Sequence, residues 1–507
     1  MMKKALYLLP LAALTACQQR VEKPNIIIIL ADDLGFGDVS AYGAATISTP
    51  NMDRLARGGV CFTNGYATSA TSTPSRYALM TGIYPWKNKD AKVLPGDAPL
   101  IISTAQFTMP GMMRQNGYYT GAIGKWHLGM GGGNIDWNTQ IIPGAKEVGF
   151  DYSCIIAATN DRVPTVYVEN GRVLGGESAD PIFVDYNRNF PGEPSGRENP
   201  ELLKMHPAHG HADAIVNGIS RIGFMQGGHA ARWVDEDMAD FFVEKVKGFI
   251  GGHKDSPFFL YYGLHQPHVP RAPHPRFAGA TTMGPRGDAI MEADWCVGEL
   301  LDCLEKNGLL ENTLIFFSSD NGPVLNDGYK DLADESVGDH KPAGKLRGGK
   351  YSLFDAGTHV PFFVYWKGKI KPAVSDALVC QMDIAASLGT LIGAEMPKEL
   401  DGQNLLNAFM GKSPGGRDDL VVEAQGRLAL RAGAWAMIPP YKGLERNLTG
   451  NELGNLPDFS LFDLHNDPGQ TTDVAARHPE KLDELKKRFL ALTEGYYKSD
   501  AGDVPLK

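Results

Sequence analysis

Four apolar segments that end in ionisable side chains constrain the fold of this chain more than any other feature. Residues 25–31 (Asn-Ile-Ile-Ile-Ile-Leu-Ala) form a continuous run typical of a strand buried on both faces, and Asp32 and Asp33 follow directly. The three other runs are 119–124 before Lys125 and His127, 258–263 before His265 and His268, and 314–319 before Asp320 and Asn321. The sequence therefore predicts strands whose carboxyl ends carry polar groups.

Helical patterns separate these strands. One helix is predicted over 235–250 and another over 291–306, the second ending at Asn307-Gly308, which is a C-terminal capping signal. Alternating strands and helices predict an α/β domain with a mostly parallel sheet and helices on both faces. Because ligands of such sheets bind beyond the carboxyl ends of the strands, we expect the charged side chains to converge there.

A metal ion is the simplest way to hold several carboxylates at one edge of a sheet. Asp32, Asp33 and Asp320 would repel one another and raise each other's pKa unless a cation lay between them, and Asn321 adds a further oxygen. An all-oxygen donor set favours Ca²⁺, with Mg²⁺ as the second choice. Taken singly, an Asp-Asp pair also suits a helix N-cap, and Asp-Asn-Gly also suits a turn.

The stretch Ser72-Thr-Pro-Ser-Arg76, which runs on into Tyr-Ala-Leu-Met-Thr-Gly, adds a candidate nucleophile. Alone it also fits a polar loop ahead of a helix that begins near Arg76. Together with the acidic and basic strand ends, it resembles the signature of the formylglycine-dependent sulfatase family. The resemblance implies an alkaline-phosphatase-like fold, in which helices sandwich a mostly parallel mixed sheet, and a bound Ca²⁺. It also implies that Ser72 is oxidised to a formylglycine aldehyde, whose hydrate attacks the sulfur of a sulfate ester.

The same resemblance implies roles for the basic side chains. Lys350 ends the stretch Leu-Arg-Gly-Gly-Lys (346–350), which is similar to the family's Arg-x-Gly-Lys element. Lys125 and Lys350 would stabilise the sulfuryl oxygens, and Arg76 would anchor the aldehyde hydrate. His268 would protonate the departing alcohol, and His127 would act as the base that releases sulfate. Taken singly, a lone His is more often structural and a lone Lys is more often solvated.

Serine at position 72 has consequences for maturation. The resemblance implies that serine-type members depend on a radical, oxygen-independent formylglycine-generating enzyme, because the aerobic enzyme accepts only cysteine. The host is then expected to be an anaerobe. A Cys-to-Ser change made to inactivate an enzyme would give the same sequence, although the intact leader argues against it.

The N-terminus reads as a lipoprotein leader. Lys3 and Lys4 precede an apolar stretch over 5–14, which is too short to span a bilayer, and Leu-Thr-Ala-Cys17 follows as a lipobox. Residues 1–16 are therefore predicted to be a signal peptide and 17–23 a tether, with a lipid on Cys17 that attaches the chain to a membrane. The prediction is an exported bacterial lipoprotein of the periplasm, outer membrane or cell surface. The alternative is an ordinary secretory signal.

Charge and cysteine content agree with an exported enzyme. The net charge of −10 argues against nucleic acid as a partner, so an anionic substrate would need a local basic pocket. The five cysteines other than Cys17 are scattered among apolar neighbours and are predicted to be buried thiols. Cys296 and Cys303 lie on one predicted helix, about 10 Å apart by helix rise, which is too far for a disulfide.

A cluster of helix-breaking residues at 411–416 predicts a domain boundary. We expect a catalytic domain over 24–411 and a smaller α+β subdomain with an antiparallel sheet over 417–507. Short strands are predicted in 420–436, and an amphipathic helix over 479–496. The element Leu-Phe-Asp-Leu-x-x-Asp-Pro at 461–468 also resembles sulfatase C-terminal domains.

Substrate choice is expected to depend on the long segment between Trp137 and Gly228. The candidate substrate contacts are Thr159, His211, Arg221 and His265. The predicted substrate is a sulfated carbohydrate, from host or algal glycans. Two alternatives remain: a phosphatase or phosphonate hydrolase of the same superfamily, and a catalytically inactive glycan-binding lipoprotein.

Overall fold

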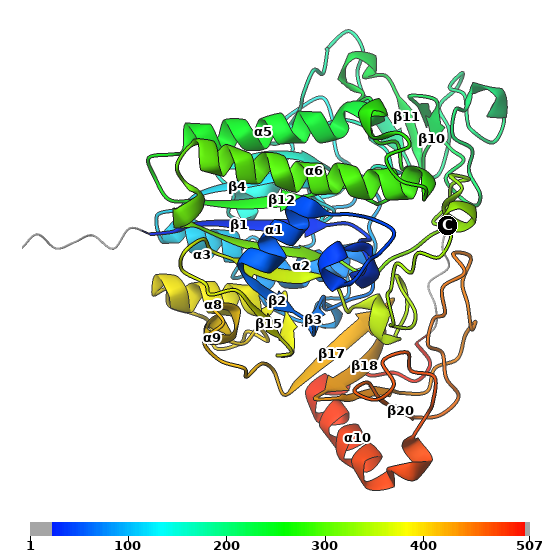
Figure 1. Ribbon diagram of the computed structural model, residues 1–507. Coiled ribbons are helices and arrows are strands. Elements are labelled where there is room, and N and C mark those ends of the chain that lie inside the picture. The colour runs from blue at the N-terminus through cyan, green and yellow to red at the C-terminus, as the bar shows by residue number, and fades with distance from the viewer. Residues whose placement is uncertain (1–22, 502–507) are drawn as a thin grey trace, which may run out of the picture.

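A ten-stranded mixed sheet forms the centre of the protein, whose computed structural model describes residues 23–501 (Figure 1). In spatial order the strands are β15 (Ala373–Ser375), β2 (Val60–Phe62), β14 (Phe362–Tyr365), β13 (Thr313–Ser319), β1 (Asn25–Ala31), β12 (Phe258–Gly263), β4 (Tyr119–Lys125), β5 (Tyr152–Ile156), β6 (Val168–Glu169) and β7 (Arg172–Val173). The strands from β13 to β5 are parallel, and they include all four strands predicted from the sequence. The predicted α/β architecture is confirmed.

Strand β1 shows why both faces of this sheet are covered. Ile26 and Ile28 point into one core, whereas Ile27 and Ile29 point into the other, as the two-residue period of a strand requires. The helices α2 (Ser72–Thr81), α3 (Met109–Gln115), α8 (Asp383–Ile392) and α9 (Leu406–Phe409) supply the first core. The helices α1 (Pro50–Gly58), α5 (Met238–Gly252) and α6 (Gly284–Lys306) supply the second (Figure 1).

Three helices begin at other residues than the sequence suggested. Helix α2 begins at Ser72 rather than near Arg76, so the candidate nucleophile lies in its first turn. Helix α6 begins at Gly284, ahead of the expected Met291, because Pro285 suits the first turn of a helix. Helix α5 begins at Met238, after a 3-10 turn over Asp235–Asp237.

Two short strand pairs lie in the long connection between β5 and α5. They are β8 (Phe183–Asp185) with β11 (Phe224–Gln226), and β9 (Ile215–Val216) with β10 (Ile219–Ser220). Elsewhere β3 (Gly65–Tyr66) pairs with β16 (Val379–Cys380), and the one-turn helices α4 (Ala145–Val148) and α7 (Ala333–Ser336) lie in loops. The pairs β8–β11 and β9–β10 stabilise the segment from which substrate contacts are expected.

A four-stranded antiparallel sheet follows the 411–416 segment, as predicted. Its strands are β17 (Asp419–Ala424), β18 (Arg427–Ala432), β19 (Trp435–Ile438) and β20 (Ser460–Asp463), and α10 (Pro479–Thr493) packs on them. The core of this part also contains Tyr66, Ala78 and Tyr84 from the large part. The two parts are thus joined by a shared core, and the limits 24–411 and 417–507 stay predictions.

The core beside α9 offers a test of the packing. Phe316 of β13 is 1% exposed, and its ring meets that of Phe409 edge to face at 5.5 Å. We expect Phe316→Ala to lower the free energy of unfolding by about 3–5 kcal/mol, because the cavity cannot close between a sheet and a helix. Thermal and urea unfolding would measure this. Leu490→Ala on α10, where the side chain is 53% exposed, serves as the control and should change little.

Of the cysteines in the described residues, Cys61, Cys154, Cys296 and Cys380 are buried free thiols, whereas Cys303 is partly exposed. The prediction of a buried thiol is wrong for Cys303, because its position on α6 is near the surface. No helix within 23–501 is both long and apolar enough to cross a membrane. The predicted signal peptide and the Cys17 lipidation site lie outside the described residues.

Candidate active site

The polar ends of β1, β4 and β13 meet the first turn of α2 at the carboxyl edge of the parallel strands. The Oγ of Ser72 lies 3.3 Å from Asp32 Oδ1 and 3.4 Å from Asn321 Oδ1. Lys125 donates from Nζ to the same Oγ at 2.9 Å. These three partners lie far from Ser72 in sequence, so the predicted convergence around position 72 is present in the fold.

Arg76 lies one helical turn below Ser72 and is fully buried. Its Nε and Nη2 donate to Asp320 Oδ2 at 3.0 and 2.7 Å, and its Nη1 donates to the Lys125 carbonyl and the Tyr261 hydroxyl. All three guanidinium nitrogens are therefore engaged with protein groups. This arrangement favours Arg76 as the residue that fixes Asp320 and Lys125, and its predicted contact with an aldehyde hydrate remains a prediction.

The acidic residues form a buried, closely spaced group. Asp32, Asp33 and Asp320 are at most 1% exposed, and Asn321 donates from Nδ2 to Asp33 Oδ1 at 2.7 Å. Burial and the neighbouring Asp320 carboxylate raise the pKa of Asp32 well above its usual range. Burial also opposes ionisation of Asp320, but the charges of Arg76 and Lys125 outweigh it and lower the pKa of that carboxyl.

These oxygens suit a hard divalent cation. The Asp32 and Asp33 carboxylates, with His268, offer ligand atoms that all lie within 4.8 Å of one another. Asp320 and Asn321 hydrogen-bond to this group, since the Asp33 amide donates to Asp320 Oδ1 at 3.3 Å. A cation among these residues would relieve the repulsion that raises the Asp32 pKa. The donor set therefore fits a divalent metal, and its oxygen-rich chemistry favours Ca²⁺ or Mg²⁺.

Two lysines flank the acidic group. Lys125 Nζ donates to Asp32 Oδ2 at 2.5 Å, and burial lowers the pKa of this lysine. Lys350 Nζ donates to Asp33 Oδ2 at 2.9 Å and to Asp327 Oδ2 at 2.7 Å. Burial alone would lower the pKa of Lys350, but Asp327 and Asp33 raise it well above its usual range. Sequence reasoning missed Asp327, because it lies in a loop without any recognisable motif.

Each candidate catalytic histidine has one ring nitrogen engaged. His127 Nε2 lies 3.0 Å from the Leu94 carbonyl, and Nδ1 has no hydrogen-bond partner among residues 23–501. His268 Nδ1 lies 2.6 Å from the Val269 carbonyl, and Nε2 lies 3.9 Å from Asp33 Oδ2. Burial, followed by nearby lysines, lowers the pKa of both rings well below the usual value. The lowered pKa disfavours the protonated form of each ring, and Nδ1 of His127 and Nε2 of His268 are the nitrogens available to a substrate.

The comparisons with known proteins agree with this geometry. The family model for sulfatases matches residues 24–394. The chain belongs to the sulfatase family. It is therefore a sulfuric ester hydrolase.

Several relatives resemble this sulfatase along almost its whole length. An N-acetylgalactosamine-6-O-sulfatase of Bacteroides thetaiotaomicron is 49% identical over 503 residues, which cover 96% of this chain and 98% of the relative. Human arylsulfatase A is 30% identical over 508 residues, covering 94% of this chain and 89% of the relative. A solved structure from a study of glycosaminoglycan metabolism by Bacteroides thetaiotaomicron has a TM-score of 0.92 at 49% identity, and covers 93% of this chain and 100% of that one.

Three of the four predicted substrate contacts of the sulfatase, Thr159, His211 and Arg221, lie in the connection between β5 and α5. Thr159 donates from its hydroxyl to Asp161, which also lies 2.9 Å from Nε2 of His211. Arg221 has no exposed surface; it donates to Asp235 Oδ2 and to the Asn160 carbonyl, each at 2.7 Å. The structure favours a supporting role for Arg221 over the predicted contact with a sugar.

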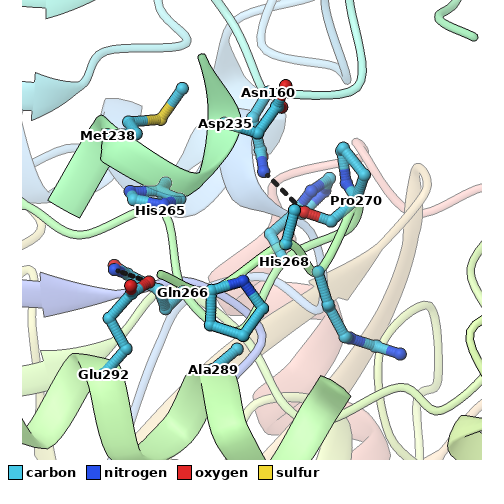
Figure 2. A pocket seen from close by; sticks show the side chains of 12 residues that line it. Asn160, Asp235, Met238, His265, Gln266, His268, Pro270, Ala289 and Glu292 are labelled. Atoms are coloured by element: carbon cyan, nitrogen blue, oxygen red, sulfur yellow. Dashed lines mark hydrogen bonds between the residues drawn. The ribbon is translucent and has the colours of Figure 1, made fainter. Parts of the chain in front are cut away.

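A small cavity beside His268 has room for about one water molecule (Figure 2). His265 lines it, and burial lowers the pKa of this ring to about 3. Three buried acceptors that line the cavity have no hydrogen-bond partner within the described part of the chain: Asn160 Oδ1, Asp235 Oδ1 and Gln266 Oε1. This side of the sulfatase site therefore presents hydrogen-bond acceptors.

Glu292 of α6, at the base of the same cavity, makes stability depend on pH. Burial raises its pKa to about 7 from 4.5, so the folded protein holds a proton that the unfolded chain releases. The contribution of the protonated Glu292 to the free energy of unfolding is fully present below about pH 4.5, and it is lost as the pH rises through about 7. We expect Glu292→Gln, which cannot ionise, to stabilise the sulfatase at pH 8 by up to about 3 kcal/mol, and to change little at pH 5.

Thermal unfolding at pH 5 and pH 8 would measure this difference. The Glu292 carboxylate accepts two hydrogen bonds: from the His274 backbone amide to Oε1 at 2.8 Å, and from the Gln266 side-chain amide to Oε2 at 2.9 Å. A glutamine at position 292 can keep both contacts, because its oxygen can accept from His274 and its NH₂ group can donate to Gln266 once the Gln266 amide has flipped. Glu244→Gln changes a side chain that is 72% exposed and is the matched control. An equal pH dependence for wild type and Glu292→Gln would contradict the assignment.

Proposed function

We propose that this sulfatase hydrolyses sulfate esters of carbohydrates, using a formylglycine made from Ser72 and a bound Ca²⁺. The observation that carries the proposal is the position of Ser72 Oγ, which contacts Asp32, Asn321 and Lys125 within 3.4 Å. The 49% identity to an N-acetylgalactosamine-6-O-sulfatase over nearly the full chain supports a 6-sulfated galactosamine-type sugar as the first substrate to test.

Two groups would bring the chemistry that standard side chains lack. Formylglycine at position 72 would supply, in its hydrated form, an oxygen nucleophile. The aldehyde can be restored after sulfate transfer, whereas an unmodified serine offers no such route. A divalent ion held by Asp32, Asp33, Asp320 and Asn321 supplies positive charge next to that position. The remaining steps belong to the lysines and histidines of the chain.

The lysines bind and orient. Lys125 already donates to the atom at position 72, so it can hold the reacting oxygen in place and also stabilise charge on the sulfuryl oxygens. Lys350 is kept protonated by Asp327 and Asp33, so it can offer a hydrogen bond to a sulfate oxygen throughout the reaction. Asp327 acts as a positioning residue for Lys350.

The histidines move protons. His268 can carry the proton for the departing alcohol on Nε2, which lies 3.9 Å from Asp33 Oδ2. Burial, followed by the charges of Lys350 and Lys125, lowers the pKa of this ring, and the charge of a bound sulfate would oppose the effect of the lysines. His127 donates from Nε2 to the Leu94 carbonyl, which leaves the Nδ1 lone pair to accept a proton when sulfate is released. The two rings therefore divide the acid and base roles between them.

Export, lipidation of Cys17 and maturation by a radical formylglycine-generating enzyme belong to the same proposal. A sulfatase tethered in the periplasm or at the cell surface would meet glycans and their fragments there. The leader of residues 1–16 and the lipobox at Leu14–Cys17 support this location.

The rival functions predict different metals and a different residue 72. A phosphonate monoester hydrolase of Agrobacterium radiobacter shares only the fold, with a TM-score of 0.57 at 20% identity. A zinc phosphatase needs clustered ligands for two metals, whereas residues 23–501 contain one group of this kind, Asp32, Asp33 and His268. A glycan-binding protein without activity would keep Ser72 unmodified.

Mass spectrometry of the Ser72 peptide, combined with sulfate release, tests the proposal. Protein matured in an anaerobic host should show a loss of about two mass units at Ser72, the difference between an alcohol and an aldehyde. It should release sulfate from N-acetylgalactosamine 6-sulfate and contain Ca²⁺ rather than Zn²⁺. An unmodified Ser72 in the native host, or phosphate ester hydrolysis in place of sulfate release, would refute it.

A further inference from the structure

Arg162 is a cation at the active site that the proposed mechanism does not use. Its Nη1 donates to Asp161 Oδ1 and Oδ2 at 2.9 and 3.1 Å and to Thr159 Oγ1 at 2.6 Å. Its Nε and Nη2 have no hydrogen-bond partner among the residues that the structure describes. The side chain is 16% exposed, so one edge of a largely buried guanidinium is open to a ligand.

The turn that carries Arg162 lies between the two catalytic histidines. His127 donates from its backbone amide to the Ala157 carbonyl at 3.2 Å, just before this turn. Asn160, within the turn, donates to the Pro270 carbonyl at 3.2 Å, close to His268 (Figure 2). Arg162 is also near enough to His127 to lower the pKa of that ring, after the larger effects of burial and Lys125. The turn that carries Arg162 therefore lies next to the proposed site of sulfate ester hydrolysis.

The guanidinium of Arg162 is held in a fixed orientation. Asp161 binds its Nη1 and is itself bound by the Thr159 hydroxyl and by His211 Nε2. The backbone amide of Arg162 donates to the Thr159 carbonyl at 3.1 Å, which closes the turn. A guanidinium fixed in this way loses little side-chain entropy when it binds a ligand.

A free guanidinium edge favours an anion. The guanidinium stays charged and has no acceptor atoms, so its N–H groups that lack a partner in the described chain suit a ligand that offers oxygen acceptors. Both ring nitrogens of His211 lie 2.9 Å from acceptors, the Asp161 carboxylate and the His209 carbonyl, which fixes the carboxylate that holds Arg162. The cavity lined by hydrogen-bond acceptors offers no comparable site for an anion.

We propose that the free Nε–Nη2 edge of Arg162 binds a second anionic substituent of the substrate, a carboxylate or a further sulfate, next to the ester that is hydrolysed. This edge matches the two oxygens of an oxyanion and can form two parallel hydrogen bonds. The reacting sulfate has its own cations, since Lys125 contacts Ser72 Oγ whereas Arg162 contacts no residue that touches that atom. The proposal rests on the sulfatase function above and adds a preference for doubly charged sugars.

The test compares Arg162→Gln with wild type on substrates that differ only in the second anion. The substrates are N-acetylgalactosamine 6-sulfate, N-acetylgalactosamine 4,6-disulfate, and a disaccharide in which a uronic acid adjoins the 6-sulfated sugar. We expect the variant to lose about 10- to 100-fold in kcat/KM, mainly through KM, on a substrate whose second anion reaches Arg162. Its kcat/KM on the monosulfated sugar should fall by a smaller factor, because the loss of Arg162 changes the charge near His127 but removes no contact with that substrate. A loss on the disulfate identifies a second sulfate as the ligand, and a loss on the disaccharide identifies a carboxylate.

Control variants separate recognition from folding. Arg197→Gln removes an arginine of the same connecting segment whose side chain is 75% exposed, and it should change none of the rates. Arg162→Lys keeps the positive charge but lacks the two parallel N–H donors of the guanidinium, so it should lose less of the preference for doubly anionic sugars than Arg162→Gln. It also serves as the test if the glutamine variant fails to fold. Equal losses on all three substrates, or no loss on any, would overturn the proposal.

A binding measurement keeps this result independent of turnover. Calorimetry with Ser72→Ala protein, with and without Arg162→Gln, should show that only the doubly anionic sugars bind more weakly when Arg162 is replaced. Equal affinities would reject the Arg162 site even if catalysis is normal. Wild-type protein that binds these sugars but hydrolyses none of them would instead reject the proposed sulfatase activity on carbohydrates.

Discussion

Replacing Ser72 by alanine is expected to abolish sulfate release, with a loss on the order of 10⁵-fold or more in kcat/KM, because alanine has no hydroxyl that can be oxidised to the aldehyde. The fold should persist, since Lys125 keeps its 2.5 Å contact with Asp32 when the serine hydroxyl is removed. Steady-state kinetics on a 6-sulfated sugar, together with thermal unfolding, would measure both effects.

Thr81→Ala is a matched control for this variant. It removes one buried hydroxyl from the same helix, where Oγ1 donates to the Tyr77 carbonyl at 2.8 Å, and it should retain most of the activity. Ser72→Cys separates maturation from chemistry, because the aerobic formylglycine-generating enzyme is expected to accept cysteine and so to restore turnover in an aerobic host. Activity that survives Ser72→Ala would show that position 72 is not the nucleophile.

Removal of the divalent ion by a chelator is expected to lower kcat/KM by about 10²- to 10⁴-fold. Three buried carboxylates would then face one another without the ion, and Lys125 and Lys350 would stay paired with Asp32 and Asp33 instead of with the sulfate. The melting temperature should also fall, because an ion that binds only the folded state stabilises it. Added Ca²⁺ should restore both properties more fully than Mg²⁺.

Metal analysis identifies the ligands. Asp33→Asn should lower both the Ca²⁺ content and the activity, because it removes a charge from the group that would bind the ion. Asp302→Asn, at a side chain that is 67% exposed on α6, should leave both unchanged. Two equivalents of zinc per chain, or full activity in metal-free Asp33→Asn protein, would contradict the calcium site.

The strands and the residues that follow them could be predicted because the signal is local. A continuous apolar run such as 25–31 favours a parallel strand that is buried on both faces. The residue that follows such a strand lies at the carboxyl edge of the sheet. Asp32, Lys125, His268 and Asp320 could therefore be grouped from sequence alone. Helix ends were less accurate, because the start of α2 at Ser72 depends on tertiary contacts of its first turn as well as on its residues.

Other residues of the site gave no such signal. Tyr261 lies inside β12 and reads as a core residue, yet its hydroxyl accepts a hydrogen bond from Arg76. Asp327 follows no strand and belongs to no motif, yet it pairs with Lys350 at 2.7 Å. Arg162 lies in a turn, yet the fold leaves only 16% of its side chain exposed. In each case the chemistry depends on a partner from a separate part of the chain or on how the fold covers the residue.

The amino-acid sequence by itself determined the α/β architecture and the family, because strand periodicity and short motifs are properties of neighbouring residues. Only the tertiary structure decided which cation faces which carboxylate, so that Arg76 fixes Asp320 while Lys125 reaches Ser72. It also decided which polar groups have no partner within residues 23–501, as at the Nε–Nη2 edge of Arg162. The physical reason is that burial and electrostatic pairing depend on distances in space, and segments far apart in the chain set those distances only when the sheet has assembled.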